Sequence, residues 1–138
     1  MHDIGLTHIA LPVTDLDKSV AFYEKYAAMK QVHYRLDEDS GWRVSWISDG
    51  TRPFVIVLIE GPPNPTPLVP MAHLGVGCKS REAVDTLCEQ ARAEGCLIGG
   101  PSDYGPPVGY WAFLRDPDGH TLELSFGQDV ALTVEENS

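Results

Sequence analysis

The stretch GYWAFLRDPDGHTLELSF, residues 109–126, predicts two strands joined by a tight turn. Pro117 and Gly119 occupy the second and fourth positions of its Asp-Pro-Asp-Gly turn, as type I geometry favours. In the second strand, Glu123 stands between two leucines. Successive side chains of a strand point to opposite faces, so the leucines and the carboxylate face opposite ways. This strand therefore predicts a sheet with one apolar face and one face that carries a carboxylate.

The order of elements that leads to this hairpin occurs twice in the chain. T-H-I-A-L-P-V at 7–13 aligns with A-H-L-G-V-G-C at 72–78, which places His8 on His73. A helical pattern follows each segment at the same offset. A repeat of this kind indicates two similar halves, each with one helix and four strands. We therefore predict an α+β fold in which the two halves pack together and leave a cleft between them.

Hydrophobic periodicity and turn signals place the elements of each half. The first half has a predicted helix at 15–28 and predicted strands at 4–13, 32–36, 42–48 and 54–59. The second half has a predicted helix at 80–94 and predicted strands at 71–78, 96–98, 109–115 and 120–126. The residues at 99–109 are rich in Gly and Pro and predict a loop.

The two halves are separated by GPPNPTPLVP at 61–70, which holds five prolines. Neither a helix nor a central strand tolerates that many, so this segment is a predicted extended linker. The chain, 1–138, is thus predicted to be a single domain of two modules, about 4–60 and 71–126. The acidic tail after Gln128 is predicted to be frayed or to form a docking arm.

Composition limits the classes of partner. The chain has 138 residues and a formal net charge of -10, so nucleic acid and anionic membrane surfaces are poor partners. No run approaches the ~18–20 apolar residues of a membrane span, and the N-terminus lacks the basic start of a signal peptide. The three cysteines read as reduced core thiols, which indicates a reducing, cytoplasmic location.

Three side chains form the candidate metal site. Equivalent positions of a two-fold repeat face each other, so we predict that His8 and His73 point at one place, with Glu123 beside them. Two imidazoles and a carboxylate suit one divalent Fe, Mn, Ni, Co or Zn ion and leave positions open. Taken alone, each histidine would be read as an ordinary hydrogen-bonded residue rather than a metal ligand. Glu123 taken alone could be a solvent-facing residue of an edge strand. The matching positions of the histidines favour the metal site.

The combination of H-I-A-L-P-V-T-D-L-D-K-S-V-A-F-Y, A-H-L-G-V and D-P-D-G-H-T-L-E-L resembles the vicinal oxygen chelate superfamily. This superfamily includes glyoxalase I, bleomycin resistance proteins, fosfomycin resistance proteins and extradiol dioxygenases. The resemblance covers about 4–126 and implies paired βαβββ modules that form an open, metal-centred, barrel-like cleft. It also implies a homodimer in most members, and it maps the metal ligands onto His8, His73 and Glu123.

The chain departs from that pattern at the fourth ligand that glyoxalase I carries on the last strand of its first half. Moving Glu123 back by the repeat offset gives Leu58, and aligning the turns gives Phe54, both apolar. Among nearby residues only Glu60 has a carboxylate. A three-ligand site resembles extradiol dioxygenases and fosfomycin resistance proteins, but 99–110 lacks a Lys/Ser-rich phosphonate-binding stretch. The chain is also shorter than the usual two-domain extradiol enzyme.

Two functions remain open from the sequence. The first is a metal-dependent lyase, isomerase or dioxygenase whose small substrate chelates the metal through adjacent oxygens. The second is a bleomycin-resistance-like protein that sequesters a small molecule without catalysis. Candidate catalytic residues are Glu123, Tyr110 and Glu60, with His33 as another acid or base. Candidate substrate-binding residues are Trp46, Phe54, Tyr104, Trp111 and Arg43. His120 adjoins the turn with the opposite strand parity to Glu123 and is not counted as a ligand.

Overall fold

The computed structural model describes residues 3–69 and 71–138, and the chain divides into two compact units. The N-terminal unit is Met1–Thr66 and the C-terminal unit is Pro67–Ser138. The boundary falls within the predicted linker, whose described part, 61–69, contains no helix or strand. Pro70, the last residue of that predicted linker, lies outside the described residues. Among the described helices, none is both long and apolar enough to span a bilayer.

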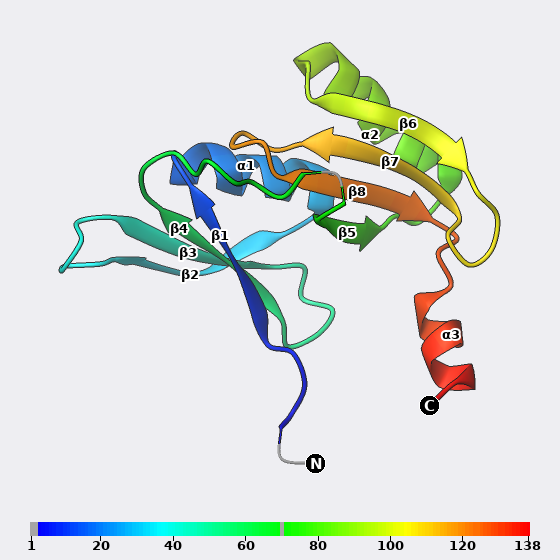
Figure 1. Ribbon diagram of the computed structural model, residues 1–138, viewed down its shortest axis with the longest axis horizontal. Coiled ribbons are helices and arrows are strands. Elements are labelled where there is room, and N and C mark those ends of the chain that lie inside the picture. The colour runs from blue at the N-terminus through cyan, green and yellow to red at the C-terminus, as the bar shows by residue number, and fades with distance from the viewer. Residues whose placement is uncertain (1–2, 70) are drawn as a thin grey trace. The chain divides into compact units, whose positions relative to one another are not determined.

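The N-terminal unit is one four-stranded sheet with one helix (Figure 1). The sheet has the order β1-β4-β3-β2, with β1 parallel to β4 and the other pairs antiparallel. The helix contacts β2, β3 and β4 and so covers one face of the sheet. The elements are β1 (His8–Val13), α1 (Leu16–Ala27), β2 (Lys30–Leu36), β3 (Arg43–Ser48) and β4 (Val55–Glu60).

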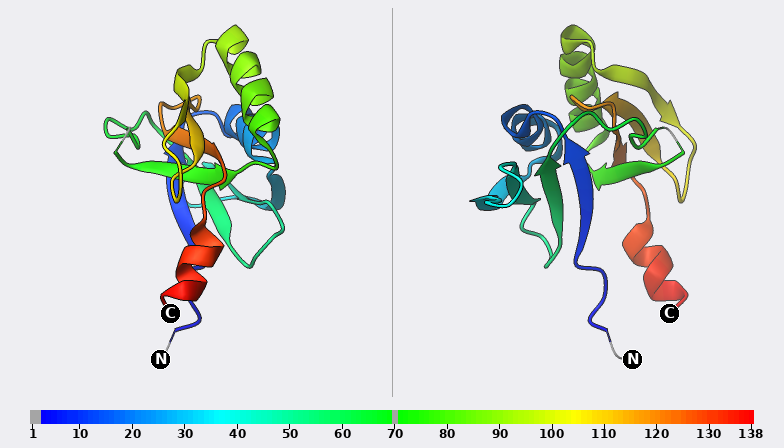
Figure 2. Two further views of the ribbon diagram at one scale, coloured as in Figure 1. Left: turned by 90° about the vertical axis from the view of Figure 1, so that its right-hand side faces the viewer. Right: turned by 60° about the vertical axis from the view of Figure 1, so that its left-hand side comes forward.

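The C-terminal unit repeats this connectivity. Its sheet has the order β5-β8-β7-β6, and β5 is parallel to β8, as β1 is to β4. Figure 2 shows α2 lying against one face of this sheet. The predicted pair of βαβββ modules is thus confirmed, and the fold class is α+β. The elements are β5 (His73–Gly77), α2 (Arg81–Glu94), β6 (Leu97–Asp103), β7 (Tyr110–Arg115), β8 (Thr121–Phe126) and α3 (Val130–Glu136).

Both long helices begin and end where their capping residues stand. The Asp15 side chain accepts the Lys18 backbone N–H at 3.2 Å at the start of α1. Ser80 Oγ accepts the Ala83 N–H at 3.0 Å at the start of α2. α2 ends at Gly95, whose φ of 77° is the left-handed C-cap conformation that glycine adopts without strain. The predicted helices at 15–28 and 80–94 are confirmed to within a residue or two at each end.

The prediction of a loop at 99–109 was wrong in part. The strand predicted at 96–98 continues to Asp103, because register shifts in the β6–β7 pairing absorb the Gly/Pro-rich residues that predicted a loop. Gly100 makes this close pairing feasible: its φ is +91°, and a Cβ there would lie 2.9 Å from the Trp111 carbonyl oxygen. The tail, predicted to be frayed or to form a docking arm, contains the short helix α3, which buries none of its residues; the docking arm stays a prediction.

Candidate functional site

In the C-terminal unit, the sheet places His73 and Glu123 on one face. β5 runs parallel to β8, with His73 opposite Thr121 and Gly75 opposite Glu123. Paired residues share a face, and so do residues two apart in one strand, so His73 and Glu123 are diagonal neighbours. A Cβ on Gly75 would lie 3.5 Å from Glu123 Oε2. The carboxylate therefore extends over β5, the strand that carries His73.

Glu123 is a buried carboxylate with a sparse set of partners. The residue is 9% exposed, and Gln128 Nε2 donates a hydrogen bond to its Oε2 at 3.3 Å. The same amide donates to the Val108 carbonyl at 3.2 Å, which ties the residues after β8 to the β6–β7 connection. Among the described residues, no Lys or Arg forms an ion pair with Glu123. Burying an unpaired carboxylate is unfavourable, so this position favours a bound cation.

An aromatic row borders this pair. The His73 and Phe113 rings have centroids 5.1 Å apart, and Phe113 in turn lies 4.8 Å from Trp111. Tyr104 meets Trp111 edge to face at 5.3 Å. The predicted substrate-binding residues Tyr104 and Trp111 therefore lie on the side of the sheet that carries His73. Phe113 was missed in the sequence, although it has the same strand parity as Trp111.

Tyr110 lies on the opposite face. Its hydroxyl donates to the Asp85 carboxylate on α2, and the Arg81 guanidinium lies over its ring, 4.0 Å from the centroid. The hydrogen bond to Asp85 is the main cause that raises the pKa of Tyr110. The structure therefore joins Tyr110 to α2 and does not bring it to Glu123. The two leucines that flank Glu123 share this face, as predicted, and both are 0% exposed.

In the N-terminal unit, His8 lies beside a pocket. The pocket has a volume of about 380 Å³, and its lining includes His8, Trp46 and Phe54. Val57 pairs with Ala10 on one side and with Trp46 on the other, so these residues share the face of β1 that carries His8. Two predicted substrate-binding residues, Trp46 and Phe54, thus adjoin one predicted ligand within a single unit.

A hydroxyl contacts the His8 ring. Thr7 Oγ1 lies 2.9 Å from Nδ1 of His8. In the tautomer that donates from Nδ1–H to the Thr7 oxygen, Nε2 carries the free lone pair that a metal needs. Thr7 was not singled out in the sequence, and its position directly before a candidate ligand is the signal that was missed.

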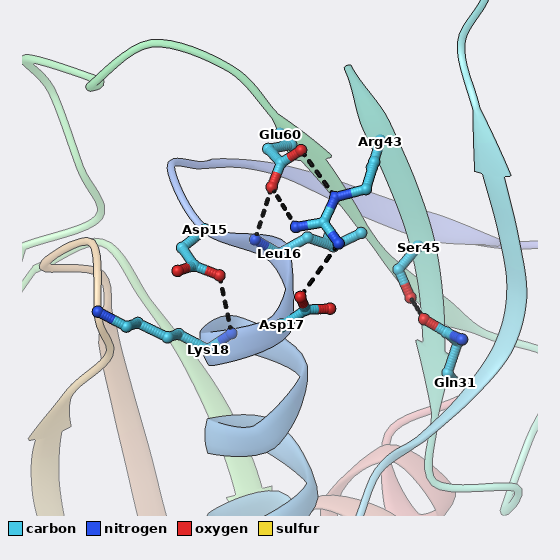
Figure 3. Close-up of polar contacts among 8 residues, drawn as sticks. All are labelled: Asp15, Leu16, Asp17, Lys18, Gln31, Arg43, Ser45 and Glu60. Atoms are coloured by element: carbon cyan, nitrogen blue, oxygen red, sulfur yellow. Dashed lines mark hydrogen bonds and ion pairs between the residues drawn. The ribbon is translucent and has the colours of Figure 1, made fainter. Parts of the chain in front are cut away.

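Glu60 and Arg43 lie on the other face of the N-terminal sheet, where they bind each other (Figure 3). Arg43 Nε and Nη2 donate to the two Glu60 oxygens at 3.0 and 2.7 Å, and the Leu16 backbone N–H donates to Glu60 at 3.0 Å. Arg43 also binds Asp17 at 3.1 Å. The Arg43 hydrogen bonds are the largest cause that lowers the pKa of Glu60 to about 2.

This arrangement supports a structural role for both residues. Glu60 pairs with Val13 of β1, which is on the face covered by α1 and not on the face of His8. A carboxylate with so low a pKa is a weak base, and its oxygens already accept three N–H groups. The geometry therefore does not support Glu60 as base or fourth ligand, nor Arg43 as a substrate contact.

The strand register also corrects the alignment of the two halves. His8 pairs with Val55 as His73 pairs with Thr121, so Glu123 corresponds to Val57. Neither of the two residues proposed from sequence offsets, Leu58 and Phe54, is the equivalent position. Val57 is apolar, so the first half supplies no acidic ligand at that position.

His120 has a structural role within the C-terminal unit. Its Nδ1 accepts the Leu68 backbone N–H at 3.0 Å, and its own N–H donates to Asp116 Oδ1 at 2.9 Å. The residue is 1% exposed, and its hydrogen bonds join the chain that enters this unit to the 116–119 turn. The exclusion of His120 from the ligand set stays a prediction.

Each unit thus contributes a separate part of the predicted site. His73 and Glu123 are neighbours in the C-terminal unit, and His8 is in the N-terminal unit beside its pocket. Within either unit, the described residues include no group of three or more His, Cys, Asp or Glu side chains that could hold a metal. The three-ligand site accordingly stays a prediction.

Two βαβββ units with this site chemistry agree with the family that the sequence motifs resemble. The chain belongs to the Glyoxalase/Bleomycin resistance protein/Dioxygenase superfamily, whose model matches residues 5–124. It is 40% identical over 128 residues to the uncharacterized protein PA2024 of Pseudomonas aeruginosa, a match that covers 91% of this chain and 90% of that protein.

Solved structures share the fold. The fosfomycin resistance protein FosX of Listeria monocytogenes matches with a TM-score of 0.72 and 23% identity over 89% of this chain and 93% of its own. A Glu-to-Gln variant of FosX, complexed with Mn(II) and 1S,2S-dihydroxypropylphosphonic acid, matches at 0.73 and 23% identity over 96% and 98%. Glyoxalase I of Leishmania major matches at 0.69 and 22% identity over 98% and 95%.

Proposed function

We propose that this chain is a metal-dependent enzyme in which His8, His73 and Glu123 bind one divalent ion, Fe, Mn, Ni, Co or Zn. In this proposal the two units, joined by 61–70, form a single domain whose cleft holds the ion. The substrate is a small molecule with two adjacent oxygens that reach the open positions. We retain the homodimer and the cytoplasmic location expected from the sequence.

The observation that carries this proposal is the environment of Glu123. Its carboxylate is buried beside His73 and receives one amide hydrogen bond, with no cationic side chain paired to it among the described residues. A carboxylate and an imidazole on adjacent rigid strands supply two of the three ligands of a familiar set. The equivalent position of His8 in the duplicated unit supports it as the third ligand. The Mn(II) complex of FosX makes manganese a good first metal to test.

In such an enzyme, different side chains would bind the metal, hold the substrate and transfer protons. When bound, the ion would stabilise negative charge on the two substrate oxygens. Trp46 and Phe54 would hold the apolar part of the substrate and exclude water from it. Gln128 would keep the Glu123 carboxylate oriented. His33, whose ring lies 4.9 Å from that of Trp46, is the candidate acid or base, since Glu60 and Tyr110 lie on the opposite faces of their sheets.

Metal removal tests this proposal directly. Untagged protein is expected to contain about one divalent ion per chain, and a chelator should lower its midpoint of thermal unfolding. A ligand present at about 100 times its Kd stabilises the native state by about 2.7 kcal/mol, which is a shift of several degrees for a domain of this size. Elemental analysis and calorimetry measure both, with re-addition of the metal as control. Substoichiometric metal and an unchanged midpoint would contradict the proposal.

A second function, sequestration of a small molecule without catalysis, is favoured by the aromatic row Tyr104–Trp111–Phe113 and by the pocket beside His8. It differs from the first in needing no metal. A screen of catechols, methylglyoxal–thiol adducts and acyl-CoA epimers, with and without metal, separates the two. Turnover that depends on metal supports the enzyme, and tight binding without turnover supports sequestration.

Thr7→Val is expected to weaken metal binding about tenfold. The hydroxyl lies 2.9 Å from Nδ1 of His8, and its loss leaves the ring tautomer and orientation unfixed. Removal of such an outer partner of a metal-binding histidine commonly lowers affinity about 10–100-fold. Competition with a chromophoric chelator measures the affinity. Thr133→Val, on the exposed helix α3, is the matched control and should have no effect. Equal affinities of the two variants would exclude a role for Thr7.

A further inference from the structure

The size and lining of the pocket in the N-terminal unit indicate which class of small molecule it can bind. Its volume is about 380 Å³, near the lower end of the range of about 300–1,000 Å³ for small-molecule sites. A space of that size suits a molecule with one or two rings rather than a long chain or a peptide. Six apolar residues contribute to its lining: Val32, Trp46, Pro53, Phe54, Val55 and Val57.

The polar residues of the pocket are few and lack acidic groups. They are Thr7, His8, Ser48 and Arg52. Among these lining residues, Arg52 is the one with a permanent charge, in a chain whose formal net charge is -10. A fixed positive charge beside an apolar pocket in an acidic protein indicates recognition of an anionic group.

Arg52 has donors to spare for such a group. Its Nε donates to Thr51 Oγ1 at 3.4 Å, a long hydrogen bond, and no ion pair to Arg52 occurs among the described residues. Asp49 is the nearby acid, and its Oδ1 accepts the Thr51 N–H at 2.9 Å and the Thr51 hydroxyl at 2.6 Å. The charge of Arg52 contributes, after these hydrogen bonds, to the lowered pKa of Asp49, but the two side chains form no ion pair. The planar guanidinium presents paired donors that match the two oxygens of a carboxylate.

We propose that the ligand of this pocket is a ring-containing carboxylate, with its apolar ring on Trp46 and Phe54 and its carboxylate on Arg52. As a statement about the substrate, this rests on the proposed function, which places the reacting oxygens near His8. As a statement about binding, it depends on the pocket alone. Binding of a carboxylate in the pocket can therefore be tested separately from the metal-dependent reaction.

The test uses the full-length protein, freed of metal by a chelator, with 1-naphthoate and its neutral analogue 1-naphthamide as probes. Calorimetric titration is expected to show that the carboxylate binds about five to ten times more tightly than the amide, which corresponds to about one charge-assisted hydrogen-bonded pair. Arg52→Gln should abolish this preference and leave amide binding unchanged. Trp46→Ala should weaken both probes, since it removes apolar contact area.

Arg115→Gln is the matched control. Arg115 is exposed in the C-terminal unit, so this variant should keep the wild-type preference. Circular dichroism verifies that each variant is folded. Equal binding of carboxylate and amide by the wild type, or a preference that survives Arg52→Gln, would overturn the proposal. Because no metal is present, a failure of the metal-enzyme proposal leaves these outcomes unaffected, and a metal-binding protein without the carboxylate preference overturns this inference alone.

Discussion

Glu123→Gln is expected to lower the affinity for the divalent ion by at least about 100-fold and to abolish metal-dependent turnover. The amide keeps the shape of the side chain but removes the negative charge that a ligand contributes. Changes in the outer partners of metal ligands already cost about 10–100-fold, so loss of a direct ligand should exceed that range. Elemental analysis and chelator competition measure the effect, with His8→Ala and His73→Ala expected to behave alike.

The same substitution makes a second prediction that involves no metal and no substrate. Glu123 is 9% exposed and has no cationic partner among the described residues. Replacing a buried charge that lacks a cationic partner with a neutral amide should therefore stabilise the metal-free protein near neutral pH, by about 0.5–2 kcal/mol. Denaturant unfolding of both metal-free proteins measures the difference.

Glu60→Gln is the matched control for metal binding. It makes the same chemical change in β4, the strand that corresponds to β8, but on the face covered by α1. It should retain metal at the wild-type stoichiometry. If Glu123→Gln also retained the metal with wild-type affinity, Glu123 would not be a ligand and the proposed site would have to be abandoned.

Glu60→Ala is expected to lower the free energy of unfolding by about 2–3 kcal/mol. The Glu60 side chain is 11% exposed, and it accepts two hydrogen bonds from Arg43 and one from the Leu16 N–H at the start of α1 (Figure 3). Hydrogen bonds to charged groups contribute about 1.5–3 kcal/mol, and the loss leaves Arg43 with only Asp17. Denaturant unfolding measures the change.

The contribution of Glu60 should depend on pH in a defined direction. Its pKa is lowered from 4.5 to about 2, mainly by the Arg43 hydrogen bonds, so the folded state favours the ionised form. The stabilisation is therefore fully present above about pH 4.5 and is lost as pH falls toward 2. Wild type should lose stability more steeply than Glu60→Ala across that window. Parallel pH profiles would show that the ion pair does not contribute as described.

Asp17→Asn supplies the control for this ion pair. Asp17 also binds Arg43, at 3.1 Å, but its side chain is 82% exposed. Pairs of this kind contribute less than about 1 kcal/mol in solution. Glu60 and Asp17 both bind the Arg43 guanidinium, so the larger loss of stability expected for the Glu60 variant reports the effect of burial and not of charge alone.

Local patterns in the sequence were enough for most of the architecture. The matching histidine segments and helix offsets predicted the two βαβββ units, and the caps at Asp15, Ser80 and Gly95 set the helix ends. Strand alternation around Glu123 correctly assigned its flanking leucines to the opposite face of the strand, although both faces of β8 are buried. These features depend on neighbours within a few residues, which is why periodicity and capping rules detect them.

Side chains that the sequence grouped by type were separated by the sheets. Tyr110 and Trp111 are adjacent in the chain, yet strand alternation directs Tyr110 to Asp85 on α2 and Trp111 to the face of His73. Arg43 was a candidate for substrate binding and Glu60 for catalysis. The pairing of β3 with β4 brings the two side chains together, and they bind each other near the start of α1.

The sequence by itself determined the duplicated α+β architecture and the one carboxylate on an apolar strand, because the internal repeat and the strand alternation can both be read along the chain. Only the tertiary structure decided which polar residues serve the fold and which remain available for chemistry. That choice depends on strand register, which makes Glu123 and His73 neighbours, and on partners distant in sequence, such as Arg43 with Glu60. A shift of one residue in register moves every side chain of a strand to the other face, so the partners of these polar residues depend on how the strands pair in the folded chain.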